Sequence, residues 1–498
     1  MNKLIDSACS KIKSLYYCRD HNFSEPEPSE HSAPPFELFS AEQRELHGKS
    51  LAGQHLLGRR NIGLKLLERL DDNARVLSEV YVQLVEDLSS ENKITAAGEW
   101  LLDNYYVIED HIQTAKRHLP GQYSRQLPQL ANGPSKGLPR VYDLAMETIY
   151  HCDGRIDTEC LGGMLEAYQS VSPLKLGELW AIPIMLRLAL IENLRRVAVK
   201  VAASRRERLA AKSWTEKIVS GLVQEPRELI QRLADMTRAV PDPSCSFIAE
   251  LTSRLHSAEA ASNLPLPWLE QCLPDSGRSI EDYVRQESQQ QASNQVSLSN
   301  CIVSLRTINA INWRSFVEEA SLVDKILRRD PAEVYARMNF ATRDRYRHVV
   351  EKMARHSPGS EADLARAALN LAAGQAQRRG QDNLAAHVGY YLLGPGKAEL
   401  EKEAGVNVRI VRKAIQLIRR QRLILYLGAL GLATAILTFI FTGQAYKDGA
   451  GFISLALISF FSVLGSSHLC LALIDWLLTL AISPKPPASD GLFAGLAG

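Results

Sequence analysis

The sequence predicts an all-α fold, with a multi-helix bundle followed by a two-helix transmembrane hairpin. Apolar residues recur at spacings of three, four and seven from about residue 40 to residue 400, and this period is typical of amphipathic helices. Two apolar runs follow, at 423–442 and from 451 to about 474, and each is long enough to cross a bilayer as a helix. No run of alternating β-branched residues between turn signals indicates a sheet.

The first 39 residues are predicted to form a flexible tail. Their centre, at 24–35, reads SEPEPSEHSAPP and is rich in Pro, Ser and Glu. Such a segment cannot bury enough apolar surface to offset the entropy of ordering it. The first helix is expected to begin after Ser40, because Ser40 and Gln43 have the spacing of a capping box.

Helices are then expected in two regions, at 40–260 and 261–405. Apolar stripes predict two of the helices, through Leu66, Leu70, Leu77, Val80, Leu84 and Leu88, and through Leu101, Tyr105, Ile108, Ile112 and Ala115. Proline and glycine interrupt the helical pattern at 120–121, 132–134, 173, 241–243 and 265–267. The Gln/Ser-rich segment 286–295 fits either a linker or a polar helix face.

Net charge and cysteine spacing argue against nucleic acid, zinc and disulfide bonds as features of this chain. The 498 residues include 58 basic and 56 acidic side chains, a net charge of +2, which does not favour nucleic acid binding. The eight cysteines form no CxxC pair and no histidine cluster accompanies them in the sequence, so neither a zinc site nor a disulfide framework is expected. We therefore expect no metal and no cofactor.

The charges around the two apolar runs predict their orientation. A basic juxtamembrane helix is expected at 406–422, before the hairpin at 423–482, whereas the loop between the runs holds one Lys447, offset by Asp448. Since Lys and Arg stay on the cytoplasmic side, the helical bundle and the C-terminal tail at 483–498 are predicted to be cytoplasmic. The alternative is a buried hairpin of a soluble protein. The residues expected to set the topology, and to attract anionic lipid of the bilayer, are Arg409, Arg412, Lys413, Arg419, Arg420 and Arg422.

A first candidate site lies at 98–140, where aromatic and acidic residues are mixed. Glu109 and Asp110 are adjacent on one helix and point about 100° apart, so they cannot flank one glycosidic bond. A solvated helix face is the preferred interpretation. Arg140 fits either phosphate binding or the anchoring of a loop through carbonyl groups. The other residues singled out here are Trp100, Asp103, Tyr105, Tyr106, Tyr123 and Arg125.

A second candidate site lies at 312–355, where basic and aromatic residues alternate in a way that can indicate RNA or nucleotide binding. Acidic residues interrupt the run and offer local ion pairs, so a surface-charged helical hairpin with buried Tyr and Phe is preferred. Helix starts are expected at Asp330–Pro331 and at Thr342. The basic residues are Arg328, Arg329, Arg337, Arg343, Arg345, Arg347, Lys352 and Arg355, and Tyr335, Phe340 and Tyr346 lie among them.

Several segments in this order resemble the N-terminal region of bacterial cyclic β-1,2-glucan synthases. They include EWLLDNYYVIEDHI, RHLPGQYSRQLPQL, RVYDLAMETIYHCDGRID, RRDPAEVYARMNFATRDRYRHVVE and AAHVGYYLLGPGKAELE. The resemblance implies a place in the bacterial inner membrane and a role in periplasmic glucan synthesis. In that family, later regions transfer glucose from UDP-glucose.

The chain departs from the resemblance in length and in motifs. It stops about where the glycosyltransferase would begin, and it contains neither the DxD nor the QxxRW motif of such transferases. The expectation is a non-catalytic membrane-anchoring and docking region, truncated or split from its glycosyltransferase part, which would be its partner. No residue is assigned as catalytic, and the roles of the candidate residues above stay open.

Two other interpretations remain. The helical region would be a carbohydrate-active domain tethered to the membrane if carboxylates such as Glu99, Asp103 or Glu147 lined a cleft. In the second interpretation, the chain is a membrane-bound helical adaptor unrelated to glucan synthesis. A homo-oligomer is compatible with each interpretation.

Overall fold

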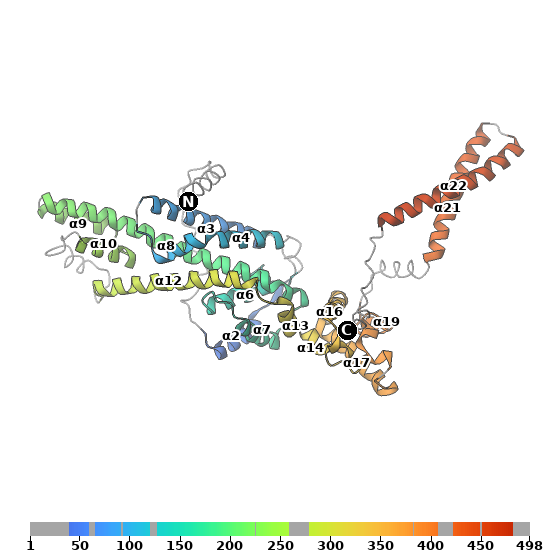
Figure 1. Cartoon of the computed structure of the whole chain (residues 1–498), viewed down its shortest axis with the longest axis horizontal. Helices are drawn as coiled ribbons and strands as arrows, with labels where there is room; N and C mark the ends of the chain where they lie inside the picture. The colour runs from blue at the N-terminus through green and yellow to red at the C-terminus, as the bar shows by residue number, and fades with distance from the viewer. Residues whose placement is uncertain are drawn as a thin grey trace, which may run out of the picture. The chain divides into compact units, whose positions relative to one another are not determined.

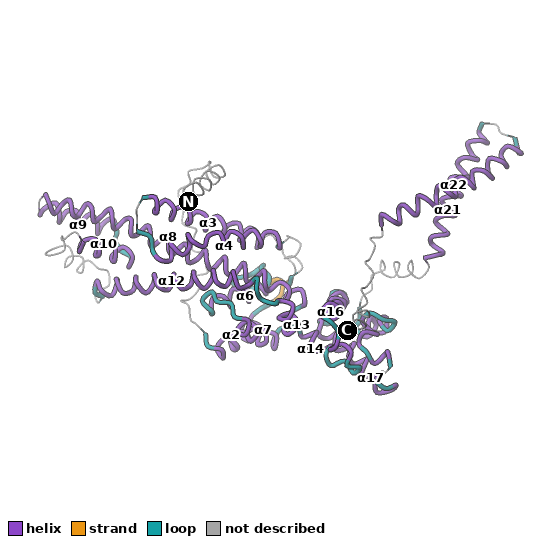
Figure 2. Tube along the Cα trace, in the orientation of Figure 1, coloured by secondary structure: helices purple, strands orange, loops and turns teal. Residues whose placement is uncertain are grey.

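The computed structural model describes residues 39–58, 65–90, 93–119, 127–224, 226–257, 278–381, 383–406, 422–448 and 451–481. These residues are mostly helical, with two strands of two residues each, which confirms the predicted all-α class (Figure 2). The chain divides into two compact units, one formed by residues up to 404 apart from 356–358, and one that contains the C-terminal hairpin. The predicted limits of the individual domains stay predictions, and the predicted tail lies, except for its last residue, outside the described residues.

The first unit is built around one long helix, α8 (Leu176–Gln224), of 49 residues. The middle of its first half is buried on all sides, because Met185, Leu186, Leu188 and Ile191, which point in different directions around the helix, are at most 4% exposed. A helix that is apolar all round must be enclosed by other elements. Five helices pack against it: α3 (Lys65–Ser89), α4 (Ala96–His118), α6 (Arg140–His151), α10 (Cys245–Ser257) and α12 (Ile280–Ile308). Figure 1 shows α3, α4 and α12 alongside α8.

The N-terminal part begins with α2 (Ala41–Gln54), and the predicted capping box between Ser40 and Gln43 is confirmed. Helix α2 packs on α7 (Thr158–Val171), and it does so closely at Gly48. A Cβ atom at Gly48 would lie 3.0 Å from the Met164 carbonyl oxygen. The two-residue strands β1 (Leu57–Gly58) and β2 (Gln129–Leu130) pair antiparallel ahead of α6 (Arg140–His151).

The two predicted apolar stripes form the inner faces of α3 (Lys65–Ser89) and α4 (Ala96–His118). Their members are buried, apart from the half-buried Tyr105 and from Leu88, which is 64% exposed. The prediction from periodicity is therefore confirmed up to the last turn of α3.

Two apolar cores lie along α8. The first core includes α8 residues as far as Val201, together with α3, α4, α6 and α7 and the end of α12 (Ile280–Ile308). The second core includes Ala211 and Ile218 of α8, the start of α12, and residues of α9 (Pro226–Ala239) and α10 (Cys245–Ser257). The Gln/Ser-rich segment 286–295 belongs to α12, so it is a polar helix face and not a linker.

A polar layer separates the two cores. Arg205 of α8 is paired through Nε and Nη2 with Asp87. The Ser246 hydroxyl donates to Glu287 Oε2 (2.7 Å), and the Ser204 hydroxyl donates to Glu287 Oε1 (3.2 Å). Because every one of these groups has a partner, burying them between the cores costs little.

The rest of the first unit consists of shorter helices. The predicted helix start at Asp330–Pro331 is wrong, because the Asp330 carboxylate instead accepts hydrogen bonds from the backbone N–H groups of Tyr335 and Val388. The start predicted at Thr342 lies three residues earlier, where Asn339 caps the helix. The helices are α13 (Trp313–Ala320), α14 (Leu322–Leu327), α15 (Val334–Arg337), α16 (Phe340–Ala354), α17 (Glu361–Arg379), the 3₁₀ helix η1 (Leu384–Ala386), α18 (Val388–Leu392) and α19 (Lys397–Glu403).

The second unit contains α21 (Arg422–Lys447) and α22 (Phe452–Ala481), which pack on each other. Both helices are long and apolar enough to span a membrane, as predicted. The Thr442 and Ser459 hydroxyl oxygens lie 3.1 Å apart between them. Of the basic residues expected to set the topology, Arg422 begins α21, and Arg409, Arg412, Lys413, Arg419 and Arg420 lie outside the described residues.

The exposed apolar surface of α21 yields a test of membrane insertion. Phe439 lies near the middle of the candidate span and is 80% exposed, whereas Tyr446 is 73% exposed at its end. An arginine at a span centre costs about 2.5–3.5 kcal/mol of insertion free energy, and much less at the interface. We expect Phe439→Arg to lower the carbonate-resistant membrane fraction and Tyr446→Arg to leave it unchanged. Equal membrane retention of the two variants would contradict the assignment.

Candidate functional site

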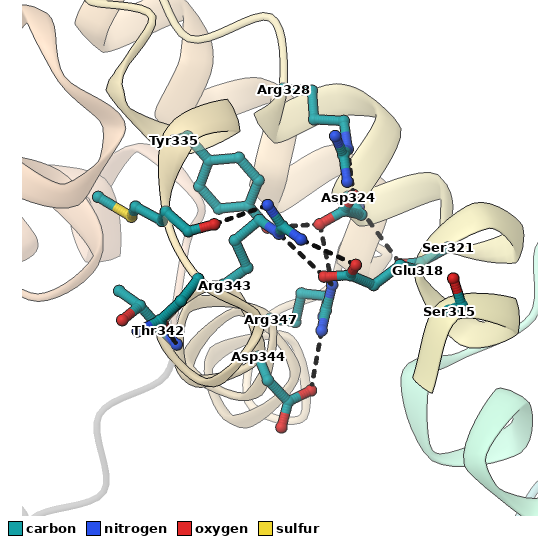
Figure 3. Close-up of polar contacts among 12 residues, drawn as sticks. Ser315, Glu318, Ser321, Asp324, Arg328, Tyr335, Thr342, Arg343, Asp344 and Arg347 are labelled. Atoms are coloured by element: carbon teal, nitrogen blue, oxygen red, sulfur yellow. Dashed lines mark hydrogen bonds and ion pairs between the residues drawn. The ribbon is translucent and has the colours of Figure 1, made fainter. Parts of the chain in front are cut away.

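Several charged side chains gather around Arg347 in what we call the Arg347 cluster: Glu318, Asp324, Tyr335, Arg343 and Arg347 (Figure 3). They come from α13, α14, α15 and α16. The Arg347 side chain is 0% exposed. Its Nη1 donates to Glu318 Oε1 (3.0 Å) and to Asp324 Oδ1 (2.9 Å), and its Nη2 donates to Asp344 Oδ1 (3.2 Å).

The remaining members complete the pairing of the two carboxylates. Arg343 donates to both oxygens of Glu318 at 2.9 Å, and its Nη1 donates to the Met338 carbonyl (2.7 Å). The Tyr335 hydroxyl donates to Asp324 Oδ1 (2.8 Å). Burial alone would raise the pKa of Glu318, but the hydrogen bonds from Arg343 and Arg347 outweigh it and hold that pKa below its usual value.

These contacts decide what the predicted basic and aromatic segment can do. Arg347 is buried and Arg343 is half-buried, and carboxylates engage both, so the prediction of a surface-charged hairpin is wrong for them. It is right for Arg337 and Arg345, which are exposed. The two guanidinium groups form ion pairs that hold the helices together. Phosphate binding would require breaking those ion pairs.

Tyr346 takes part in a second polar contact. Its hydroxyl oxygen lies 3.4 Å from His387 Nε2, and His387 Nδ1 lies 2.6 Å from Asp330 Oδ2. Burial raises the pKa of Asp330, but hydrogen bonds from His387 and from the Val388 backbone lower it by more. The pKa of Asp330 therefore lies below its usual value. The chain of contacts fastens the segment before α18 to α16, which makes Tyr346 a packing residue in this structure.

Arg140 is the first residue of α6, and its side chain reaches the N-terminal end of α8, where it binds Glu178. Its Nε and Nη2 each donate to a Glu178 oxygen at 2.7 Å, and Nη2 also donates to the Pro173 carbonyl (2.7 Å). Of the two roles left open by the sequence, the structure shows the anchoring of a loop. Glu178 also accepts from the Lys175 backbone N–H (2.9 Å).

Glu361, from α17, reaches the same helix end and accepts from the Leu176 backbone N–H (2.9 Å). Its side chain is buried, and burial together with the negative charges of Glu351 and Glu178 raises its pKa to about 7, although the Leu176 hydrogen bond lowers it. Carboxylates at the start of a helix satisfy free N–H groups and interact favourably with the helix dipole.

The residues of the first candidate segment do not join these clusters. Asp103 and Glu109 are exposed on α4, as expected for a solvated face. The half-buried Tyr105 stacks on Tyr81 with 4.1 Å between ring centroids. Trp100 is partly exposed, and the exposed Tyr106 accepts a hydrogen bond from Arg306 (3.1 Å). The predicted site residues Tyr123 and Arg125 lie outside the described residues.

An open groove of about 830 Å³ borders the Arg347 cluster, between α7 and the helices α13 and α14. Glu318 and Arg328 form part of its wall, and the Lys325 ammonium lies 3.0 Å from Glu166 Oε1 there. The cluster therefore fixes the position of charged side chains that line the groove.

Removal of the Arg347 guanidinium is expected to destabilise the first unit strongly. Arg347→Met leaves Asp324 and Glu318 buried without their shared partner, and such losses cost about 3–5 kcal/mol. Arg345→Met, on the exposed side of the same helix, should change stability by less than about 0.5 kcal/mol. Thermal unfolding of the full chain in detergent, followed by circular dichroism, measures both. Equal melting temperatures would show that the cluster does not stabilise the unit.

Glu361 predicts a dependence of stability on pH. Its carboxyl group ionises near 4.5 when unfolded and at about 7 when folded, so the folded state holds a proton that the unfolded state has released. The free energy of unfolding should therefore fall as pH rises from about 4.5 to about 7. Glu361→Gln keeps a hydrogen-bond acceptor for the Leu176 N–H but cannot ionise. It therefore avoids the loss in the free energy of unfolding that Glu361 causes, which is on the order of 3 kcal/mol at pH 8. We expect it to raise the melting temperature more at pH 8 than at pH 5.

The exposed Glu403 provides the matched control for that measurement. Glu403→Gln should shift the melting temperature equally little at both pH values. A Glu361→Gln effect that is the same at pH 5 and pH 8 would contradict the raised pKa.

Comparison with known proteins relates 354 residues of this chain, 70% of its length, to cyclic beta-(1,2)-glucan synthase NdvB of Rhizobium meliloti (strain 1021) at 32% identity. The match covers 12% of that relative, so the chain corresponds to a small part of its length. No family model matches the sequence. The resemblance inferred from the sequence motifs is confirmed: this chain is related to the cyclic β-1,2-glucan synthases.

Proposed function

We propose that this chain is a non-catalytic membrane-anchoring and docking region of a cyclic β-1,2-glucan synthase, which acts together with the glycosyltransferase part of such a synthase. The observation that supports this most is the similarity to a glucan synthase over most of the chain but only 12% of the relative. Its role would be to hold the transferase at the inner membrane during periplasmic glucan synthesis.

The anchoring half of the proposal rests on α21 and α22. Both expose large apolar side chains, such as Phe439, Phe452 and Phe461, as expected of helices that face lipid. The basic residues ahead of α21, compared with the single Lys447 before the loop, support a cytoplasmic first unit and a cytoplasmic C-terminal tail.

The docking half rests on the first unit. Buried ion pairs hold α13, α14 and α16 in a fixed arrangement beside the open charged groove. A surface held by such pairs changes little on binding, which lowers the entropy lost when a partner docks. We propose this groove as part of the surface that receives the transferase.

The non-catalytic part of the proposal rests on the carboxylates and motifs. The sequence contains no DxD or QxxRW motif. Glu99 and Asp103 lie on the exposed face of α4, and Glu147 is engaged by His47 and His151. These positions lend no specific support to a carbohydrate-active enzyme domain, for which two carboxylates must face each other across a cleft.

A reconstitution test follows. The transferase part of a glucan synthase is expressed with the full chain, with a chain lacking 422–481, or alone, and labelled glucan made from UDP-glucose is measured in washed membranes. We expect membrane-bound synthesis only with the full chain, and none from the purified chain by itself. Glucan made by the purified chain, or membrane-bound synthesis that is the same without it, would overturn the proposal.

A further inference from the structure

Three metal-ligating side chains meet on the first unit, away from the Arg347 cluster. His47 lies on α2, and Glu147 and His151 lie one turn apart on α6. Their ligand atoms, one from each residue, all lie within 4.8 Å of one another. The sequence separates His47 from Glu147 by 100 residues, so only the packing of the two helices brings them together.

The geometry of the three atoms is that of an open coordination site. Glu147 Oε2 lies 2.9 Å from His47 Nε2 and 3.3 Å from His151 Nε2. Ligand atoms bound about 2.0–2.2 Å from a tetrahedral Zn²⁺ ion lie about 3.3–3.6 Å apart. The 3.3 Å edge between Glu147 and His151 has that spacing, and the 2.9 Å edge between Glu147 and His47 is shorter. Two histidines and one carboxylate leave further positions for water or another ligand.

The ligands are accessible and held in place. Their side chains are 27% (His47), 28% (Glu147) and 17% (His151) exposed, so an ion can enter from solvent. Phe39 stacks on the His151 ring with 3.7 Å between centroids and meets the His47 ring edge-on. The Phe39 carbonyl accepts from Arg44 Nη1 (2.7 Å), which fixes the aromatic residue over the histidines.

We propose that His47, Glu147 and His151 form a site for a divalent transition cation of the Zn²⁺ class, which clamps α2 to α6. Imidazole and carboxylate are ligands that such ions accept, and the two histidines favour Zn²⁺, Co²⁺ or Ni²⁺ over Mg²⁺ or Ca²⁺. Helix α2 already packs on α7 at Gly48, and the ion would add a second attachment of the same helix.

The test uses the full chain in detergent, with a reductant present, and measures Zn²⁺ binding by calorimetry and Co²⁺ binding by visible absorption. We expect one ion per chain, a tetrahedral or five-coordinate Co²⁺ spectrum, and slower hydrogen exchange in α2 with Zn²⁺ bound. His47→Ala and His151→Ala should each weaken Zn²⁺ binding at least tenfold.

Two control variants make the result specific. His348 also contacts two carboxylates, those of Asp344 and Glu351, but no second histidine joins them in the described contacts, so His348→Ala should leave Zn²⁺ affinity unchanged. Cys152 follows His151 directly, and its thiol lies 3.3 Å from that of Cys160. The double variant Cys152→Ser, Cys160→Ser should also retain binding.

The proposed site would be overturned if the cysteine variant lost Zn²⁺ binding, or if His47→Ala bound Zn²⁺ as tightly as the wild-type chain. Circular dichroism spectra and melting temperatures of the metal-free variants establish that each is folded. A histidine variant that is misfolded is replaced by Glu147→Gln, which keeps the shape of the side chain and removes its charge, and which should lower Zn²⁺ affinity in the same way.

Discussion

The arrangement of α13, α14 and α16 depends on the guanidinium of Arg347, which is a charge with no access to water. Removing an ion from water costs several kcal/mol, and that cost is offset only while its partners keep good hydrogen-bond geometry. The partners of Arg347 come from α13, α14 and α16 itself. These three helices therefore cannot shift independently. The groove beside them is held rigid as well, because α13 and α14 form part of its wall.

The start of α8 applies the same principle to a helix terminus. Its free N–H groups are met by Glu178 from the helix itself and by Glu361 from α17. Arg140 neutralises Glu178 and ties in the loop at Pro173. The long central helix is thus fastened at one end to both earlier and later parts of the chain, through groups that are buried but paired.

The sequence predicted the features that depend on local pattern. Helical class, the capping box at Ser40 and the buried faces of α3 and α4 follow from periodicity and spacing within a few residues. The anchoring role of Arg140 was one of two options, because its partner Glu178 is 38 residues away and no local rule selects it.

The charge clusters could not be predicted in the same way. Arg347 pairs with residues 29 and 23 positions away, in helices joined by turns whose geometry the sequence does not specify. One signal was available: Arg347 lies three residues before the buried Val350 and four after Arg343, so it shares the inner face of α16. Likewise, no metal site was expected from the sequence. Glu147 and His151 are four residues apart on one helix and so share a face, but His47 could be added only from the packing of α2.

The polar layer between the two cores along α8 has a consequence for how the molecule unfolds. Each core has its own apolar contacts, and the continuous elements between them are α8 and α12. Segments with separate cores tend to open as separate cooperative blocks. We therefore expect the block of α9, α10 and the start of α12 to open separately from the other block, which would broaden the melting transition of the helical unit.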